Sequence, residues 1–166
     1  LARITYQRLF RRYLRLAGMT GTGREVAREI RDVYRLDVVD VPLNKPSRRQ
    51  DLGACLVRTR AEKWKRVAAA AERLASQGRP VLVGTRSVAA SEELSAELAA
   101  RGVAHALLNA KQDREEAEII ARAGEAGRVT VATNMAGRGT DIALGEGVAE
   151  AGGLHVILTE YHESAR

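Results

Sequence analysis

The sequence has 166 residues, of which 45% are hydrophobic, and a formal net charge of +6, a composition typical of a globular protein of about one domain. Its apolar runs are far shorter than the ~20 residues that a transmembrane helix needs. It has no signal-peptide pattern at its start, so we expect a cytoplasmic protein. The single cysteine, Cys55, excludes an internal disulfide. The three histidines are too widely spaced for a zinc site, so we interpret them as structural or surface residues.

The charge is unevenly distributed along the chain. Residues 1–66 carry 17 Lys and Arg against 7 Asp and Glu, whereas residues 110–166 carry 6 against 10. A basic leading segment could meet phosphates, an anionic membrane surface or an acidic partner. The four arginines from Arg8 to Arg15, however, are interspersed with apolar residues, as in an amphipathic helix. We therefore interpret them as a solvated helix surface.

The first 46 residues predict two helices and a strand. Tyr6–Leu16 has the pattern of a helix, and Ala17–Thr22 has the Gly and Thr content of a strand end that turns into a loop. Arg24–Tyr34 predicts a second helix. Leu36–Val41 alternates apolar and acidic residues, which predicts a half-buried strand. The proline-containing connector that follows marks a domain boundary after residue 46.

From residue 47 onward, helices and short strands alternate regularly. Helices are predicted at 61–77, 89–101 and 113–123, and strands at 81–85, 104–108, 129–133 and 153–159. Gly78 is placed to end the first helix, and Trp64 lies on that helix's apolar face, where we expect it in the core. This alternation predicts an α/β fold: a parallel sheet covered by helices on both faces.

The string TNMAGRGTDI, residues 133–142, begins at the last residue of the predicted strand 129–133. Ligands of open parallel sheets bind in loops at the carboxyl ends of the strands. Gly137 and Gly139 permit tight turns and close backbone approach. Arg138 offers a planar cation for phosphate or carboxylate, and Asp141 offers acceptors for sugar hydroxyls. The string therefore predicts a ligand-binding loop with groups suited to phosphate, carboxylate and sugar hydroxyls, and its full ten-residue length makes it more specific than a glycine-flanked turn alone.

This string resembles motif V of the SecA ATPases, a branch of the superfamily-two helicase motors. Four further segments resemble the same family in the same order: LAGMTGT at 16–22 (motif III), PVLVGT at 80–85 (motif IV strand), LLNAK at 107–111, and AGGLHVI with HES at 151–164 (the run before motif VI). The resemblance spans nearly the whole chain from Ile4 onward.

The resemblance implies a RecA-like fold of the P-loop NTPase type, corresponding to the C-terminal domain of a helicase. In the family, ATP lies between two such domains, and the first carries the phosphate loop and the magnesium carboxylate. This chain has no G-x-x-x-x-G-K-[ST] sequence. The resemblance therefore implies that residues 1–46 are the tail of a first domain and 47–166 a second domain cut before motif VI. ATP would be the cofactor, with Mg²⁺ held by the absent domain, and the isolated chain would be inactive.

The resemblance also assigns site residues. Arg138 is the candidate catalytic residue. Nucleotide binding is assigned to Gly137, Gly139, Thr140 and Asp141, and coupling of hydrolysis to movement to Thr20, Gly21 and Thr22. Simpler interpretations are a loop cap for Asp141 and a strand end for the two threonines.

In the full-length protein, the resemblance implies a translocase that moves preproteins through a membrane channel, at the inner face of the cell membrane. Binding to an anionic membrane surface and formation of an oligomer stay open, and nucleic acid is disfavoured as a partner. Two alternatives remain: the second domain of a nucleic-acid helicase, and a catalytically weakened, regulatory SecA paralogue. The paralogue is favoured by departures from the family pattern: Gln112 and Asp113 follow N-A-K where histidine is usual, and Tyr161 and Ala165 replace arginines.

Overall fold

The computed structural model describes residues 3–108, 116–133 and 141–161. Contacts within the chain divide it into two compact units, with the division between Gly53 and Ala54. The units are described separately.

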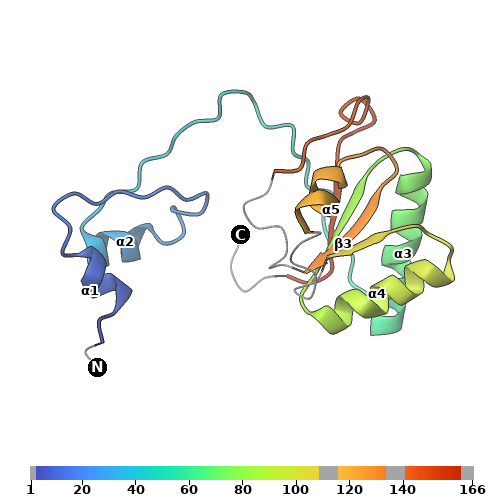
Figure 1. Ribbon diagram of the computed structural model, residues 1–166, viewed down its shortest axis with the longest axis horizontal. Helices are drawn as coiled ribbons and strands as arrows, with labels where there is room; N and C mark the ends of the chain where they lie inside the picture. The colour runs from blue at the N-terminus through green and yellow to red at the C-terminus, as the bar shows by residue number, and fades with distance from the viewer. Residues whose placement is uncertain (1–2, 109–115, 134–140, 162–166) are drawn as a thin grey trace. The chain divides into compact units, whose positions relative to one another are not determined.

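The second unit is built on a four-stranded parallel sheet with the strand order β2-β3-β1-β4 (Figure 1). Its strands are β1 (Val81–Thr85), β2 (Ala106–Leu108), β3 (Val129–Thr133) and β4 (His155–Leu158). Every residue of β3 is buried, whereas residues of the edge strand β4 alternate between half-buried and exposed. The four predicted strands and their parallel pairing are confirmed, although β2 and β4 begin later than expected.

The described residues of this unit also form three helices: α3 (Arg60–Ser76), α4 (Val88–Ala100) and α5 (Glu116–Arg122). Hydroxyl side chains cap the first two. The Oγ1 of Thr59 accepts the backbone N–H of Glu62 at 3.1 Å, and the Oγ of Ser87 accepts that of Ala90 at 3.2 Å. Gly78 follows α3 with φ at +79°, the left-handed conformation that ends helices at glycine, as predicted.

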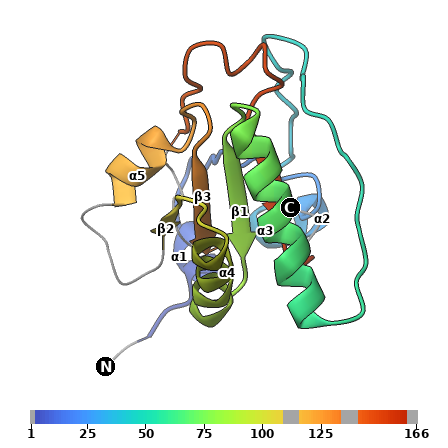
Figure 2. The same cartoon turned by 90° about the vertical axis from the view of Figure 1, so that its right-hand side faces the viewer.

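The helices cover both faces of the sheet, as Figures 1 and 2 show. On one face, α3 and α4 form the larger core with the two central strands: Trp64, Ala68, Ala71, Leu74, Val81, Val83, Ala90, Leu94, Leu98, Val129 and Val131. On the other face, α5 contributes to a smaller cluster in which Leu108, Ile120 and Ala132 are buried. Trp64 is 6% exposed, so its predicted core position is confirmed. The predicted α/β class with two covered faces is confirmed as well.

The first unit contains two short helices, α1 (Tyr6–Phe10) and α2 (Ala27–Tyr34). Among its described residues, 3–53, Gly23 alone is buried. Surface ion pairs link α2 and its approach to the segment that follows: Arg24 Nε donates to Asp40 at 2.7 Å, and Arg31 Nη2 donates to Asp37 at 2.7 Å. The Arg24 guanidinium holds the pKa of the Asp40 carboxyl below its usual value, chiefly by this hydrogen bond. The unit therefore has an exposed polar network but no buried side-chain core in its described part.

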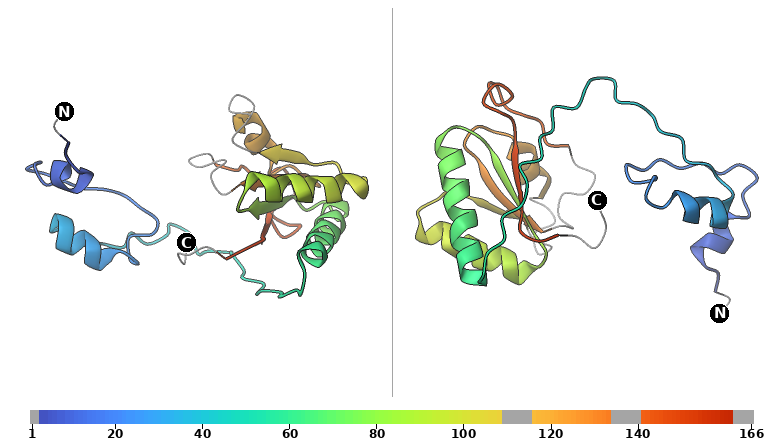
Figure 3. Two further views of the ribbon diagram at one scale, coloured as in Figure 1. Left: turned by 90° about the horizontal axis from the view of Figure 1, so that it is seen from below. Right: turned by 180° about the vertical axis from the view of Figure 1, so that it is seen from behind.

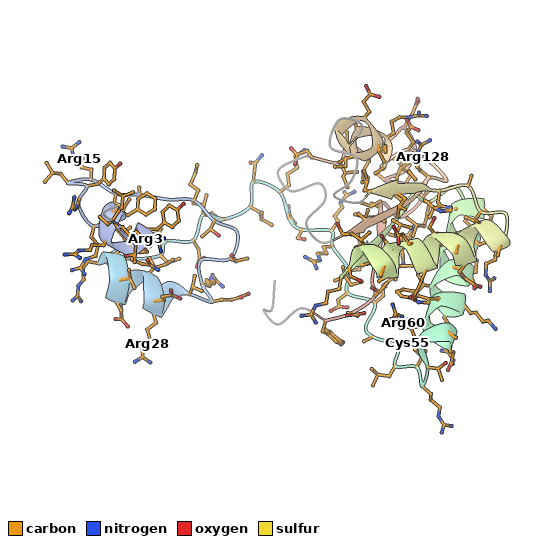
Figure 4. The ribbon with its side chains drawn as sticks, turned by 60° about the horizontal axis from the view of Figure 1, so that its bottom comes forward. Arg3, Arg15, Arg28, Cys55, Arg60 and Arg128 are labelled. Carbon is orange, nitrogen blue, oxygen red and sulfur yellow. The ribbon has the colours of Figure 1, made fainter. Side chains whose placement is uncertain are left out.

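The basic character of this unit lies on its surface. The four arginines from Arg8 to Arg15 are exposed, as predicted. Figure 4 shows Arg15 and Arg28 projecting outward, and the Arg28 side chain is 97% exposed. Arg28 also forms an i,i+4 ion pair with Asp32 at 3.8 Å, and both side chains remain largely exposed to solvent.

Three predictions for the first unit were wrong. Leu36–Val41 and Ala17–Thr22 contain no strand, and the helix predicted to reach Leu16 ends at Phe10. A strand requires a hydrogen-bonded neighbour, and the described part of this unit offers none. A helix this short gains its stability mainly from tertiary packing, which is sparse here. Residues 41–56 likewise run without helix or strand (Figure 3).

Candidate functional site

All four strands of the second unit end at one edge of the sheet. Thr85, the last residue of β1, lies opposite Thr133, the last residue of β3. Leu158 of β4 lies opposite Gly84, and β2 ends beside Ala132. Since ligands of open parallel sheets bind at this edge, the loops that leave these residues are the first candidates for a site.

Hydroxyl groups connect the central strand β1 to both of its neighbours at this edge. The Oγ1 of Thr85 donates to the carbonyl of Ala132 in β3 at 3.3 Å. On the other side, the Oγ1 of Thr159 donates to the carbonyl of Gly84 at 2.9 Å. Thr85 is 2% exposed and Thr133 7% exposed. These contacts, one buried and one partly buried, lie outside the regular strand pairing and link the ends of the three strands.

The predicted motif V loop begins at this edge, directly after β3. Gly137, Arg138, Gly139 and Thr140 lie outside the described residues. Asp141 is the first described residue after them, and its side chain is exposed at the return of the loop. Its exposed carboxylate is accessible to a ligand.

The chain is anchored immediately after Asp141. Ile142 packs against the smaller core cluster beneath α5. The amide of Gly145 donates to the carbonyl of Gly124 at 2.9 Å. A Cβ at Gly124 would collide with the backbone carbonyl of Ala143, so the two segments are in contact through backbone atoms. Asp141 therefore emerges from a return segment whose position is fixed by packing.

The predicted coupling residues form a local turn in the first unit. The backbone N–H of Thr22 donates to the Oγ1 of Thr20 at 3.2 Å, and the two hydroxyl oxygens are 3.1 Å apart. Gly21 lies between them and is exposed. The next residue, Gly23, is buried, and a Cβ there would lie 3.2 Å from Val38. The structure thus brings Thr20, Gly21 and Thr22 together as one turn, while Asp141 belongs to the second unit.

Sequence reasoning missed a group of cations at the same edge of the second unit. An open groove of about 660 Å³ is lined by Val57, Arg58, Thr59, Arg60, Lys63, Arg86, Ser87, Ala90 and Glu160. Two lining residues, Thr59 and Ser87, could have been identified in the sequence, because they are N-cap residues that predict where helices begin. Their convergence could not be predicted, because the lining comes from segments far apart in the chain.

The two described histidines have structural surroundings. His105 Nδ1 donates to the carbonyl of Val103 at 2.9 Å, and its Nε2 lies 2.7 Å from the Oγ of Ser95. His155, the first residue of β4, lies opposite Val81 and thus at the amino edge of the sheet. Burial lowers the pKa of His155, and the nearby charges of Arg79 and Arg73 lower it further. His162 lies outside the described residues.

Residues 3–108, 116–133 and 141–161 contain neither a membrane-spanning helix nor a group of metal-binding side chains. None of the helices in these ranges has the length and apolar character required to cross a membrane. Within the same ranges, no three His, Cys, Asp or Glu side chains gather closely enough to hold a metal ion.

Relatives of known name match the whole chain. It is 55% identical over 166 residues to the protein translocase subunit SecA 2 of Nitrosospira multiformis and 58% identical to that of Bordetella avium, and covers 25% of each relative. It is also 55% identical to the protein translocase subunit SecA of Nitratidesulfovibrio vulgaris, and covers 20% of it. The chain thus spans a quarter or less of the length of these relatives.

Two family models match successive parts of the chain. The model of the SecA DEAD-like domain matches residues 1–31, and that of the SecA P-loop domain matches residues 46–149. The second match covers more than half of the chain and includes β1, β2, β3 and the motif V string. On these findings, the chain belongs to the SecA family.

Proposed function

We propose that this chain is part of an ATP-driven motor that moves preproteins through a membrane channel, and that its second unit closes on ATP held by another domain. The observation that carries the proposal is the position of TNMAGRGTDI, directly after the fully buried strand β3 at the ligand-binding edge of a SecA-family sheet. The relatives are named as protein translocase subunits, which favours translocation over nucleic-acid unwinding.

The domain assignment is part of this proposal. Residues 1–46 would be the tail of the first nucleotide-binding domain, and residues 47–166 the second domain. The match of the DEAD-like domain model to residues 1–31 supports this division, as does the absence of a buried side-chain core in the described part of the first unit. Mg²⁺ would be held by the remainder of the first domain, as the resemblance to the SecA ATPases implies.

The chemistry assigned to the motif V loop follows from charge. Arg138 would stabilise negative charge on the transferring phosphoryl group once the two domains close. Gly137, Gly139 and Thr140 would let the backbone approach the nucleotide, and Asp141 would bind its ribose. Thr20, Gly21 and Thr22 would couple hydrolysis to movement. In this proposal the full-length protein works at the inner face of the cell membrane, and the isolated chain hydrolyses no ATP, because it lacks the phosphate loop.

The test uses the full-length parent with Arg138→Ala and, as matched control, Arg128→Ala. Both remove one arginine that lies within five positions of β3 in the sequence, but Arg128 precedes the strand, at the amino edge. We expect Arg138→Ala to lower kcat for ATP hydrolysis at least a hundredfold with a small change in KM, because a group that acts only in the closed state stabilises the transition state. Arg128→Ala should keep its turnover. A variant at position 138 with unchanged kcat and raised KM would make Arg138 an ordinary binding residue.

A second measurement separates translocation from hydrolysis. In the full-length parent, Thr22→Val removes one hydroxyl of the turn described above. Transport of a preprotein into membrane vesicles should fall several-fold more than ATP hydrolysis does. Equal losses of transport and hydrolysis would instead place Thr22 in the nucleotide site.

A further inference from the structure

A serine and a histidine are in hydrogen-bond contact in a part of the second unit outside the motif V string. Ser95 lies in the last two turns of α4, and His105 directly precedes β2. The Ser95 Oγ is 2.7 Å from the His105 Nε2, a distance at which a base can take up a proton. Both side chains are partly buried, so the contact is sheltered but not sealed from solvent.

The position of the protons in this contact follows from a third group. The His105 Nδ1 lies 2.9 Å from the backbone carbonyl of Val103, and a carbonyl can only accept a hydrogen bond. Nδ1 therefore carries the N–H, which leaves the lone pair of the neutral ring on Nε2. The Ser95 hydroxyl must then donate to Nε2. Nucleophile, base and orienting acceptor thus stand in the order that activates a serine.

The acceptor that orients the ring is itself held in place. Gly102 ends α4 with φ at +71°, and the Val103 N–H donates to the carbonyl of Leu98 in α4 at 2.9 Å. The Val103 side chain packs against the larger core. Because the helix end fixes Val103, and Val103 orients the ring, the base is preorganised to face Ser95.

The base is also accessible from outside. His105 lines an open hollow of about 320 Å³ at the amino edge of the sheet, where most of the other lining residues are small. The hollow contains one ion pair, in which Arg128 lies 3.8 Å from Glu125. The imidazole can therefore exchange its proton with solvent while its Nε2 faces the serine.

The arrangement is suited to acyl transfer. A serine paired with an oriented histidine is the constellation that attacks acyl carbons. Phosphoryl transfer, in contrast, depends chiefly on cations that clamp the transferred group. The contact supplies a nucleophile and a base, so the acyl donor must bring a good leaving group of its own.

We propose that Ser95 is an acyl acceptor, activated by His105 as general base, for small activated esters. The Ser95 Oγ forms a bond to the acyl carbon, and the bond from that carbon to the leaving oxygen breaks. The hydroxyl proton passes to the His105 Nε2 and then to the leaving oxygen, so that the products are an ester at Ser95 and a free alcohol. The proposal does not depend on the motor function, because neither residue belongs to the motif V string or to the turn at Thr20–Thr22.

The test treats the 166-residue chain with p-nitrophenyl acetate and locates the acetyl groups by peptide mapping and mass spectrometry. Ser76 is the internal control. Its Oγ also donates within a helix, to the carbonyl of Arg73 at 2.8 Å, but a carbonyl takes up no proton. General-base catalysis contributes about 10²- to 10⁴-fold, so Ser95 should be acetylated at least ~100-fold faster than Ser76. This comparison needs no substitution and does not depend on the folding of a variant.

Substitution of the base gives a second comparison. His105→Gln should slow acetylation of Ser95 about 100-fold or more and leave the rate at Ser76 unchanged. The matched control is His155→Gln, which removes the other partly buried histidine among the described residues and should leave both rates unchanged. Trp64 fluorescence checks that each variant is folded.

The pH profile separates a base from a structural histidine. In the parent, the rate at Ser95 should rise with pH in parallel with loss of the proton from the His105 ring, which NMR follows over the same range. Glu125 and Arg128, which line the hollow with the ring, are the charged groups beside it there. A purely structural role for His105 would produce no such parallel.

The outcomes are distinct. Acetylation of Ser95 that follows the ring titration and is lost in His105→Gln supports the proposal. Equal rates at Ser95 and Ser76, or a rate at Ser95 that His105→Gln leaves unchanged, would overturn it. Acetyl groups on His105 with none on Ser95, in the parent and in Ser95→Ala alike, would make the histidine the nucleophile and overturn it as well.

Discussion

At the scale of single residues, Glu93 shows how one carboxylate organises the start of α3. It accepts the indole N–H of Trp64 at 2.7 Å and lies 2.8 Å from the Arg60 guanidinium. The buried Trp64 ring thereby keeps a partner for its one polar group, which costs free energy when left unsatisfied. This contact between α3 and α4 also fixes one wall of the groove.

We predict that Asp141 binds the ribose of ATP in the full-length parent. A carboxylate is repelled by the polyphosphate, whereas ribose hydroxyls can donate charge-assisted hydrogen bonds to it. Since such a bond contributes roughly 1.5–3 kcal/mol, Asp141→Ala should weaken ATP binding about tenfold or more. The measurement compares ATP with an analogue that lacks both ribose hydroxyls, in a background blocked for hydrolysis. The parent should discriminate between the two nucleotides and Asp141→Ala hardly at all. Equal discrimination by both proteins would assign Asp141 to capping the loop.

His155 should make the second unit less stable in acid. Burial and the charges of Arg79 and Arg73 lower its pKa in the folded state below the ordinary value of 6.5. When the pH falls through that ordinary value, the unfolded chain takes up the proton first, so the free energy of unfolding decreases until the folded pKa is also passed. Urea unfolding at several pH values, followed by Trp64 fluorescence, measures this slope. His155→Gln should flatten it below pH 6.5, and NMR titration of the ring should give a midpoint below that value. A midpoint at or above 6.5 would contradict the prediction.

At the scale of elements, the return of the chain after the motif V string depends on close backbone contact with the end of α5. The carbonyl of Ala143 occupies the space where a Cβ of residue 124 would lie. Ile142 and the hydrogen bond from Gly145 to Gly124 complete this contact. A side chain at position 124 would therefore push away the segment that carries Asp141.

Gly124→Ala should destabilise the second unit by about 1–3 kcal/mol, the usual cost of overpacking. In the full-length parent it should also weaken ATP binding if Asp141 contacts the nucleotide. The control is Gly145→Ala in the same contact, where an added Cβ would lie 3.4 Å from its nearest atom, close to ordinary van der Waals contact. Chemical unfolding of both variants gives the comparison. Similar free energies of unfolding for the two variants would contradict the prediction, because the segment that carries Asp141 would then shift without loss of stability.

The sequence predicted the elements of the second unit far better than those of the first. β1 and β3 were predicted to the residue, because buried β-branched strands between capped helices have a strong local pattern. Leu36–Val41 has an alternating pattern too, yet forms no strand, since pairing depends on a neighbour that the pattern does not reveal. The groove escaped prediction for a similar reason: Lys63 and Glu160 meet across 97 positions of sequence. The TNMAGRGTDI loop was identified by its family resemblance, and its central residues lie outside the described ranges.

At the scale of the whole molecule, the two units differ in how much they bury. The second unit has two buried clusters, while the first buries Gly23 alone among its described residues. Because burial of apolar surface is the main favourable term in folding, the units should differ in stability. The exposed connection at residues 41–56 should open most readily.

Limited trypsin digestion of the 166-residue chain should therefore cut first after Arg48 or Arg49, which are exposed and lie outside helices and strands. Cleavage after Lys45 should be slow, since Pro46 follows it. Arg66 and Arg73 are the internal control: both are exposed, but the helix α3 protects their backbone. Mass spectrometry should identify an early fragment that begins at residue 49 or 50. The purified fragment should retain the unfolding transition that Trp64 fluorescence reports. Early cuts within α3 would contradict the stability difference.

The edge strand β4 determines how this sheet could grow. Val156 is 51% exposed and Leu158 65% exposed, while Ile157 between them packs into the larger core, so the two exposed side chains are on the α5 face. From β2 to β3 to β4 the chain advances across the sheet in one direction, and α5 and Ile142 lie on that same face. Parallel strands are connected with a right-handed crossover in ~98% of cases. A fifth parallel strand laid beside β4 would continue the same advance. A right-handed connection from β4 to that fifth strand would cross the α5 face of the sheet. It would therefore cover Val156 and Leu158.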